Sequence, residues 1–258
     1  WGFSIISFNS LETYEVIGLT ISLGIVLSSN GINVAHELGH RNNTIEKTLS
    51  KLLLIPSLYM HFYIEHNFGH HKNVATKEDP ATAKKNQSLY SFWITSVIGQ
   101  YLSAWRIQLK LLKQNNSSFF SVKNDMLFYT LFQLIYLSML YNFFGIFTLF
   151  IAVLVAVISF LLLETINYIE HYGLLRKKIN GRYEKVQTIH SWNSNHFVGR
   201  IVLYELTRHS DHHYRTSKKY QILENKKESP QLPFGYPTSM LISMIPPLWY
   251  RLMNPRLV

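Results

Sequence analysis

The chain has 258 residues, of which 47% are hydrophobic and only 16% are charged, and it carries a formal net charge of +10. It contains no cysteine, which excludes disulfides, iron–sulfur clusters and thiolate metal sites. The glycine-rich signatures of dinucleotide-binding and P-loop folds are also missing, so the sequence contains no motif for binding a nucleotide.

The first predicted element is a membrane-spanning helix in the charge-free stretch 16–35, which is about long enough to cross a bilayer. Residues 52–64 are also apolar, but this stretch is short and contains Pro56. We expect it to be a re-entrant or partly buried helix that returns the chain to the side it came from. Residues 86–105 carry no charge but are rich in Ser, Gln, Tyr and Trp.

A second, longer charge-free run covers residues 126–163. It is too long for one crossing and contains an Asn-Phe-Phe-Gly break at 142–145, so it predicts a helical hairpin with arms 126–141 and 146–163. The tail, 230–247, is apolar and rich in proline, which breaks a helix. We expect the tail to pack on the cytoplasmic body or to enter the membrane interface, and not to form one straight helix.

The distribution of basic residues indicates an orientation. No Lys or Arg precedes Arg41, and none lies between Lys123 and Arg176, so in this arrangement all 25 basic residues fall on one side of the membrane. The positive-inside rule places that side in the cytoplasm. We therefore expect an all-α integral membrane protein, with residues 1–258 in a single membrane-embedded catalytic domain. The positive charge reflects this bias and predicts no binding of nucleic acid.

Histidines gather in three clusters, in the sequences HELGH, EHNFGHH and RHSDHH, and a further histidine stands alone in NYIEHYG. Spacings of three and four residues place side chains on one face of a helix. Neutral imidazole is the commonest metal ligand in proteins, and three such clusters indicate metal binding. The candidate ligands are His36, His40, His66, His70, His71, His209, His212, His213 and, standing alone, His171.

The number of histidines predicts two metals, because an octahedral ion accepts at most six ligands and a zinc site takes three or four. Only 25 residues separate His40 from His66, too few to cross a bilayer and return, so the clusters can converge in one cytoplasmic cup at the membrane. HELGH also matches the zinc-protease pattern H-E-x-x-H, in which Glu37 would be the general base. That pattern needs only two histidines and a carboxylate, and an intramembrane zinc protease stays a remote alternative.

Four motifs together carry a family resemblance: HELGHR, EHNFGHH, NYIEHYGLLR and RHSDHH. In this order, and with the stretches VATKEDPATA and ESPQLPFGYP, they resemble the membrane alkane 1-monooxygenases from about Gly31 to the C-terminus. The related xylene monooxygenases and the fatty-acyl hydroxylases and desaturases share the histidine clusters and remain alternatives. The NYIEHYG motif favours the alkane hydroxylases.

The resemblance implies a membrane desaturase-like architecture in the bacterial inner membrane, with further N-terminal transmembrane helices in the full-length proteins. It implies two Fe ions held by the nine histidines, with O2 as co-substrate. The reaction would be terminal hydroxylation of medium- or long-chain n-alkanes drawn from the bilayer. The electrons would come from rubredoxin and its NAD(P)H-dependent reductase.

Other polar residues are candidates for supporting the ligands, because a carboxylate often accepts the far ring N–H of a ligating histidine. The alternative role for the acids is as solvated charges or helix caps. We expect His61 and His190 to be structural. The supporting candidates are Glu65, Glu170, Asp211, Asn193, Asn195 and His196. Basic candidates for docking an acidic electron donor are Arg41, Lys72, Arg176, Arg208 and Arg215.

Overall fold

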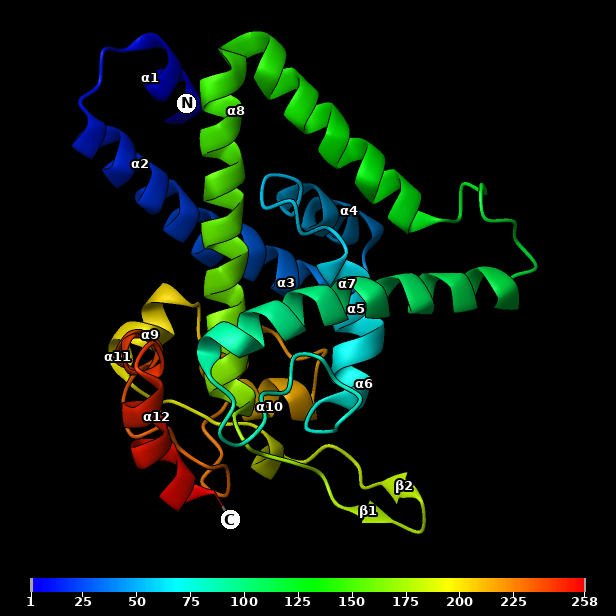
Figure 1. The fold of residues 1–258 in the computed structure, drawn as a ribbon. Coiled ribbons are helices and arrows are strands. Elements are labelled where there is room, and N and C mark those ends of the chain that lie inside the picture. The colour runs from blue at the N-terminus through cyan, green and yellow to red at the C-terminus, as the bar shows by residue number, and fades with distance from the viewer. Residues whose placement is uncertain (1, 258) are drawn as a thin grey trace. The chain divides into compact units, whose positions relative to one another are not determined.

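The computed structural model describes residues 2–257, which are mostly helical and form two compact units (Figure 1). The first unit contains the residues up to Ile64 together with Ala104–Leu163. The second contains Glu65–Ser103 and the residues from Glu164 onward. Helices α7 (Leu89–Gln114) and α8 (Asp125–His171) each contribute to both units.

The first unit begins with α1 (Gly2–Phe8), α2 (Thr13–Val26), the π-helical turn η1 (Leu27–Ile32) and α3 (Asn33–Gly39). Together, Thr13–Gly39 form one continuous helical stretch that is long and apolar enough to cross a membrane, and Asp125–His171 is the second such stretch among the described residues. These stretches contain the predicted span 16–35 and the predicted hairpin 126–163.

Helix α8 folds back sharply on itself (Figure 1). The break lies at Gly145, whose backbone has φ 77° and ψ 178°, a conformation open to glycine because it lacks a Cβ atom. The predicted hairpin and its break at 142–145 are thus confirmed. The first arm begins at Asp125, where the carboxylate lies 2.9 Å from Nζ of Lys51.

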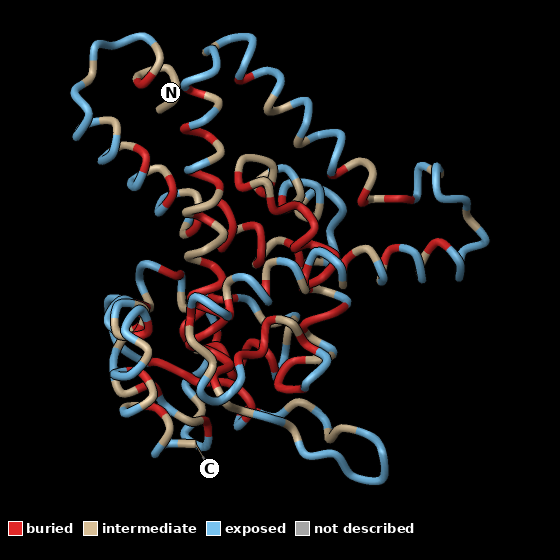
Figure 2. Tube along the Cα trace, viewed as in Figure 1, coloured by how far each residue is buried: buried red, intermediate tan, exposed pale blue. Residues whose placement is uncertain are grey.

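The prediction of a helix over 52–64 is wrong. Helix α4 (Thr44–Leu53) ends before Pro56, a series of turns follows, and helix resumes only at α5 (Phe62–Glu65). Proline lacks the backbone donor that would continue a helix, which explains the interruption. The stretch is nevertheless largely buried, as expected for a segment packed inside the protein (Figure 2).

The second unit contains the remaining elements, packed around an aromatic core of Trp192, Trp249, Tyr168 and Tyr172. The tail consists of two helices separated near Ile245, which confirms that it is not one straight helix. The helical elements of this unit beyond α7 and α8 are η2 (His66–His70), α6 (His71–Asn73), η3 (Thr188–His190), α9 (Phe197–Val202), α10 (His209–Tyr214), η4 (Tyr220–Ile222), α11 (Tyr236–Ser243), α12 (Pro246–Met253) and η5 (Asn254–Arg256).

The expectation of an all-α protein needs one correction. Strands β1 (Lys178–Ile179) and β2 (Arg182–Tyr183) form a short antiparallel hairpin. Its two turn residues, Asn180 and Gly181, both have positive φ, at 48° and 80°. An Asn-Gly pair favours this kind of tight turn, so the signal was present in the sequence.

Candidate metal centre

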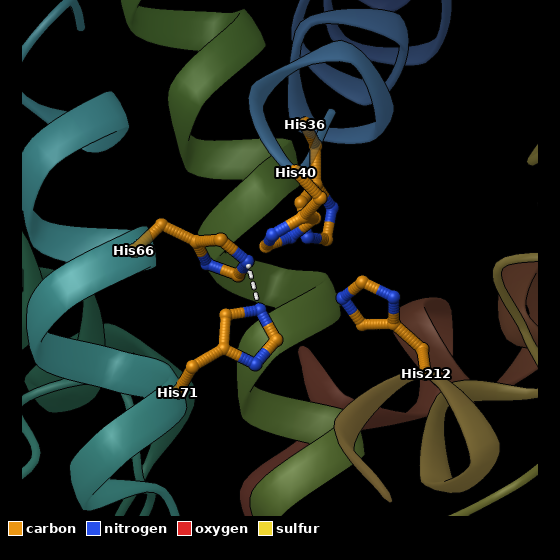
Figure 3. Close-up of side chains that lie close together, drawn as sticks. All are labelled: His36, His40, His66, His71 and His212. Atoms are coloured by element: carbon orange, nitrogen blue, oxygen red, sulfur yellow. Dashed lines mark hydrogen bonds between the residues drawn. The ribbon is translucent and has the colours of Figure 1, made fainter. Parts of the chain in front are cut away.

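The second histidine cluster lies on a π-helical turn and not on a regular α-helix. In η2 the backbone N–H of His71 donates to the carbonyl oxygen of His66, five residues earlier. The Nε2 atoms of these two histidines lie 2.8 Å apart (Figure 3). The i, i+4 spacing would place His66 and His70 on one face of a regular α-helix, and the sequence left open how the histidines divide; the π turn brings His66 together with His71. Such turns occur frequently at functional sites.

Helix α10 also divides its histidines between two groups. His212 lies with His66 and His71, its ring centroid 5.0 Å from that of His71 (Figure 3). His209 and His213, one turn apart, instead bring their Nε2 atoms to 2.8 Å from each other. The spacing placed these three histidines on one face of the helix and left their division open, and the structure assigns them to two groups.

The second group consists of four buried histidines within one unit: His70, His171, His209 and His213. Nε2 of His209 lies 3.2 Å from Nε2 of His171, and Nε2 of His213 lies 3.3 Å from Nε2 of His70. One potential ligand atom of each ring lies within 4.8 Å of those of the other three. We call this group the four-histidine cluster.

The spacing of these nitrogens fits a metal ion. Two nitrogens bound about 2.1 Å from one ion at right angles lie about 3.0 Å apart. The Nε2–Nε2 distances in the four-histidine cluster, 2.8, 3.2 and 3.3 Å, lie just below and just above this value. Burial also holds the pKa of His213 well below its usual range, which keeps this ring in the neutral form that binds metals.

The first unit supplies a further pair of histidines at the end of α3. The ring centroids of His36 and His40 lie 5.0 Å apart, as their i, i+4 spacing predicts, and both are labelled in Figure 3. His36 also packs edge-on against Phe62. Glu37, the base of the protease alternative, forms an ion pair with Arg41.

Asp79 is a member of the site that the sequence analysis missed. Its Oδ2 atom lies 3.0 Å from Nδ1 of His70 and accepts a hydrogen bond of 2.6 Å from the Thr82 hydroxyl, while Oδ1 accepts from the backbone N–H of Ala81. Burial opposes its ionisation, but His70 and Thr82 together keep the pKa of Asp79 below its usual value. Asp79 therefore orients His70 with Nε2 towards the other three histidines.

The predicted supporting acids have three different environments. Glu170 is buried, lies 3.1 Å from Nε2 of His209 and accepts a 2.8 Å hydrogen bond from the Tyr236 hydroxyl. Glu65 is buried near Ser103, and burial raises its pKa well above the usual value. Asp211 pairs with the ammonium of Lys218 at 2.7 Å.

The remaining polar candidates are Asn193, Asn195 and His196. Asn193 is buried, and its side chain accepts a hydrogen bond from the backbone N–H of Ser210 in α10, so it helps to fix the helix that carries His209. Asn195 is exposed and receives hydrogen bonds from Arg208. His196 is exposed.

His61 and His190 lie outside both groups, as expected for structural histidines. Burial lowers the pKa of His61 to about 3, so its ring is neutral. His190 lies 3.3 Å from the carboxylate of Glu184.

Comparisons with known proteins agree with the motifs. The sequence profile of the fatty acid desaturase family matches residues 13–251. The alkane 1-monooxygenase of Acinetobacter baylyi is 41% identical over 255 residues, which cover 98% of this chain and 62% of that protein. The alkane 1-monooxygenase of Pseudomonas putida is 39% identical over 250 residues, 96% of this chain and 62% of that protein.

A xylene/toluene monooxygenase hydroxylase component of Pseudomonas putida is more distant, at 28% identity over 254 residues, 95% of this chain and 66% of that protein. The resemblance to alkane 1-monooxygenases is thus confirmed. The chain spans about three fifths of the length of the alkane 1-monooxygenases it matches, as the 61 to 64% coverage shows.

Proposed function

Because the chain belongs to the fatty acid desaturase family, we propose that it is an alkane 1-monooxygenase, which uses O2 to hydroxylate the terminal carbon of medium- and long-chain n-alkanes. The similarity to alkane 1-monooxygenases, at about 40% identity, supports this reaction over others in the family. The structural observation that carries the proposal is the convergence of four buried ring nitrogens at metal-ligand spacing.

We propose that nine histidines hold two iron ions. The four-histidine cluster would bind one, and His66, His71 and His212 would bind the other. His36 and His40 are the remaining two of the nine, and their helical spacing suits a pair of metal ligands. Imidazole ligands suit iron, and bound iron would supply the oxygen-activating chemistry that ordinary side chains lack.

The surrounding residues orient the ligands and exclude water. Asp79 accepts the hydrogen of His70 Nδ1, which leaves Nε2 free to bind. Tyr236 holds the carboxylate of Glu170 at the edge of the cluster. All four rings of the cluster are buried, so the metal would be shielded from bulk solvent. Such shielding suits an oxidation of this kind, because excluding water from the site prevents side reactions.

The substrate and the electrons would come from separate partners. An alkane offers no polar group, so its binding must come from apolar burial, about 0.8 kcal/mol for each buried CH2. We propose that it enters from the bilayer. The sequence contains no cysteine and no dinucleotide-binding or P-loop signature, which supports the proposal that a separate protein delivers the electrons. Rubredoxin, reduced by its NAD(P)H-dependent reductase, would deliver them.

We propose a multi-pass location in the bacterial cytoplasmic membrane, with the histidines facing the cytoplasm. The two stretches long and apolar enough to cross a membrane support the location. The absence of any Lys or Arg before Arg41 and between Lys123 and Arg176 supports the orientation.

The main alternative is a related hydroxylase or desaturase that acts on a methylated aromatic ring or a fatty-acyl chain. The similarity to a xylene/toluene monooxygenase component supports this second candidate, but at 28% identity it is weaker. The zinc protease alternative has no support from the family match, which includes the HELGH motif.

Competing substrates distinguish these functions. Cells that express the protein with a rubredoxin system would be given equimolar octane, hexadecane and p-xylene, and their products would be analysed by gas chromatography. We expect 1-alkanols as the main products. Methylbenzyl alcohol as the main product, or desaturated acyl chains without alkanols, would replace the proposal with the alternative.

A further inference from the structure

Helix α7 buries polar side chains and exposes large apolar ones within the second unit, although Leu89 and Phe92 on its buried side also pack into the aromatic core. Ser96 and Gln100, on one face, are buried and donate hydrogen bonds of 2.6 and 2.8 Å to the buried carboxylate of Glu164. Ile94 and Ile98, on the other face, are 65% and 57% exposed. A helix surrounded by water shows the reverse, with its apolar face inward.

Two further helices of this unit show the same inversion. In α11, Ser239 and Ser243 are fully buried, while Leu241 and Ile245, which follows the helix, are more than half exposed. In α9, the buried residue is Gly199, and Val198 is exposed. The outward side chains of both helices are therefore mostly apolar, with Thr238 of α11 as a polar exception.

Direct contacts connect these segments. The Tyr90 hydroxyl at the start of α7 donates a 2.8 Å hydrogen bond to the carbonyl oxygen of Met244 at the end of α11. Gly199 of α9 lies beside the start of α11, because an added Cβ atom would be 3.7 Å from the backbone nitrogen of Tyr236, an ordinary contact distance. We call the resulting surface the inverted face. Its exposed side chains are Tyr90, Ile94, Ile98, Phe197, Val198, Ile201, Leu241, Met244, Ile245 and Leu248.

The inverted face has a basic edge. Lys84 and Lys85 precede α7 and are exposed, and Arg256 is exposed near the end of the chain. A 2.7 Å hydrogen bond from Asn254 to Asn86 joins these two segments. An apolar surface bordered by lysine and arginine is typical of segments that lie in a membrane interface, where the cations meet anionic headgroups.

Lengths exclude a transmembrane role for the two short helices. A crossing needs about 20 apolar residues, whereas α9 has six and α11 has eight. Helix α7, with 26 residues, is not among the stretches apolar enough to cross. Its exposed Tyr90 and partly buried Trp93 are residue types enriched where a bilayer meets water.

We propose that the inverted face lies in the interfacial zone of a lipid bilayer, with acyl chains covering its apolar side chains and anionic headgroups at its basic edge. The second unit then rests on the membrane through helices that do not cross it. This proposal does not depend on the proposed reaction. Its test measures contact with lipid and requires no enzymatic turnover.

The absence of cysteine from the 258 residues permits labelling at single sites. The variants Ile94→Cys, Val198→Cys and Ile245→Cys would each carry an environment-sensitive fluorophore, with the protein reconstituted in vesicles of zwitterionic and anionic phospholipid. Matched controls are Ile179→Cys and Ile222→Cys, whose isoleucines are 59% and 58% exposed elsewhere in the same unit. Lipids carrying a nitroxide near the headgroup or at the chain end would then quench the labels by depth.

We expect blue-shifted emission at the three face sites, strong quenching by the shallow nitroxide and weaker quenching by the deep one. The two control sites should instead be quenched by aqueous iodide. Iodide quenching of the face sites equal to that of the controls would overturn the proposal. So would protection of the labelled sites from both quenchers together with disulfide cross-linking between copies of the unlabelled cysteine variants, because that would identify a second copy as the occupant. Three independent sites keep the test decisive if one variant fails to fold.

Discussion

Replacing Asp79 by asparagine should weaken metal binding at the four-histidine cluster while leaving the protein folded. Oδ2 of Asp79 now accepts from both His70 Nδ1, at 3.0 Å, and the Thr82 hydroxyl, at 2.6 Å. An asparagine has only one acceptor oxygen, and its NH2 group would oppose the N–H of His70 if it faced the ring. His70 would then favour the tautomer with hydrogen on Nε2, the atom that faces the metal.

Loss of such a carboxylate partner typically costs about 10- to 100-fold in metal affinity. That range corresponds to roughly 1.4 to 2.8 kcal/mol of binding free energy. The assay is an anaerobic competition between the metal-free protein and a coloured chelator for Fe(II), with thermal unfolding as the check on folding. It requires no enzymatic turnover.

Glu184→Gln is the matched control, because Glu184 lies 3.3 Å from His190, a histidine outside both metal-binding groups. We expect this variant to bind iron like the unmodified protein. Unchanged affinity in Asp79→Asn, to within about two-fold or 0.4 kcal/mol, would refute the reasoning. An equal loss in Glu184→Gln would show that the effect is one of overall charge and not of ligand orientation.

The remaining predictions concern one ligand, the electron donor and a buried hydrogen bond. His171→Ala should remove activity and lower bound iron measured by mass spectrometry, whereas His61→Ala should keep its iron; full activity of His171→Ala would exclude it as a ligand. Turnover at limiting rubredoxin should fall with added NaCl, because salt screens charges beyond about 10 Å at 0.1 M, and Lys72→Glu should mimic that loss with iron retained; a flat salt response would mean that docking is not electrostatic. Gln100→Leu should destabilise the protein by roughly 1–3 kcal/mol, because a buried acceptor loses its partner, while Gln114→Leu, at an exposed position of the same helix, should change thermal unfolding little; equal effects would contradict the role of the buried bond.

The sequence predicted which histidines matter better than it predicted how they combine. Spacing alone brought His36 and His40 together correctly, since α3 is a regular α-helix. The same spacing could not decide the partner of His66, because a π turn brings this ring beside His71. The extra residue in such a turn depends on packing around it, which a local pattern does not encode.

Asp79 shows a second limit of sequence reasoning. The acids that attracted attention, Glu65, Glu170 and Asp211, all adjoin a candidate ligand in the chain. Asp79 lies nine residues beyond His70, and a loop held by Thr82 brings it back to the ring. Adjacency was misleading for Asp211, whose carboxylate pairs with Lys218. Contacts made through loops require the fold.

Charge-free runs located the apolar helices well, because length and composition decide whether a helix can cross a bilayer. The apolar run at residues 52–64 did not predict the local structure, because Pro56 interrupts the helix there. The charge-free run at 86–105 did not show which of its side chains are buried. Residues 86–105 form most of helix α7, which buries Ser96 and Gln100 beside apolar residues and exposes Ile94 and Ile98. Composition alone could not separate the buried side chains from the exposed ones.

The most direct test of the proposed function is oxidation of octane under 18O2 by the purified protein with rubredoxin, its reductase and NADH. The protein would be loaded with iron or with zinc, and the product analysed by mass spectrometry. We expect 1-octanol that contains one 18O atom, formed only by the iron-loaded protein. Unlabelled octanol, or equal activity of the zinc-loaded protein, would contradict the account.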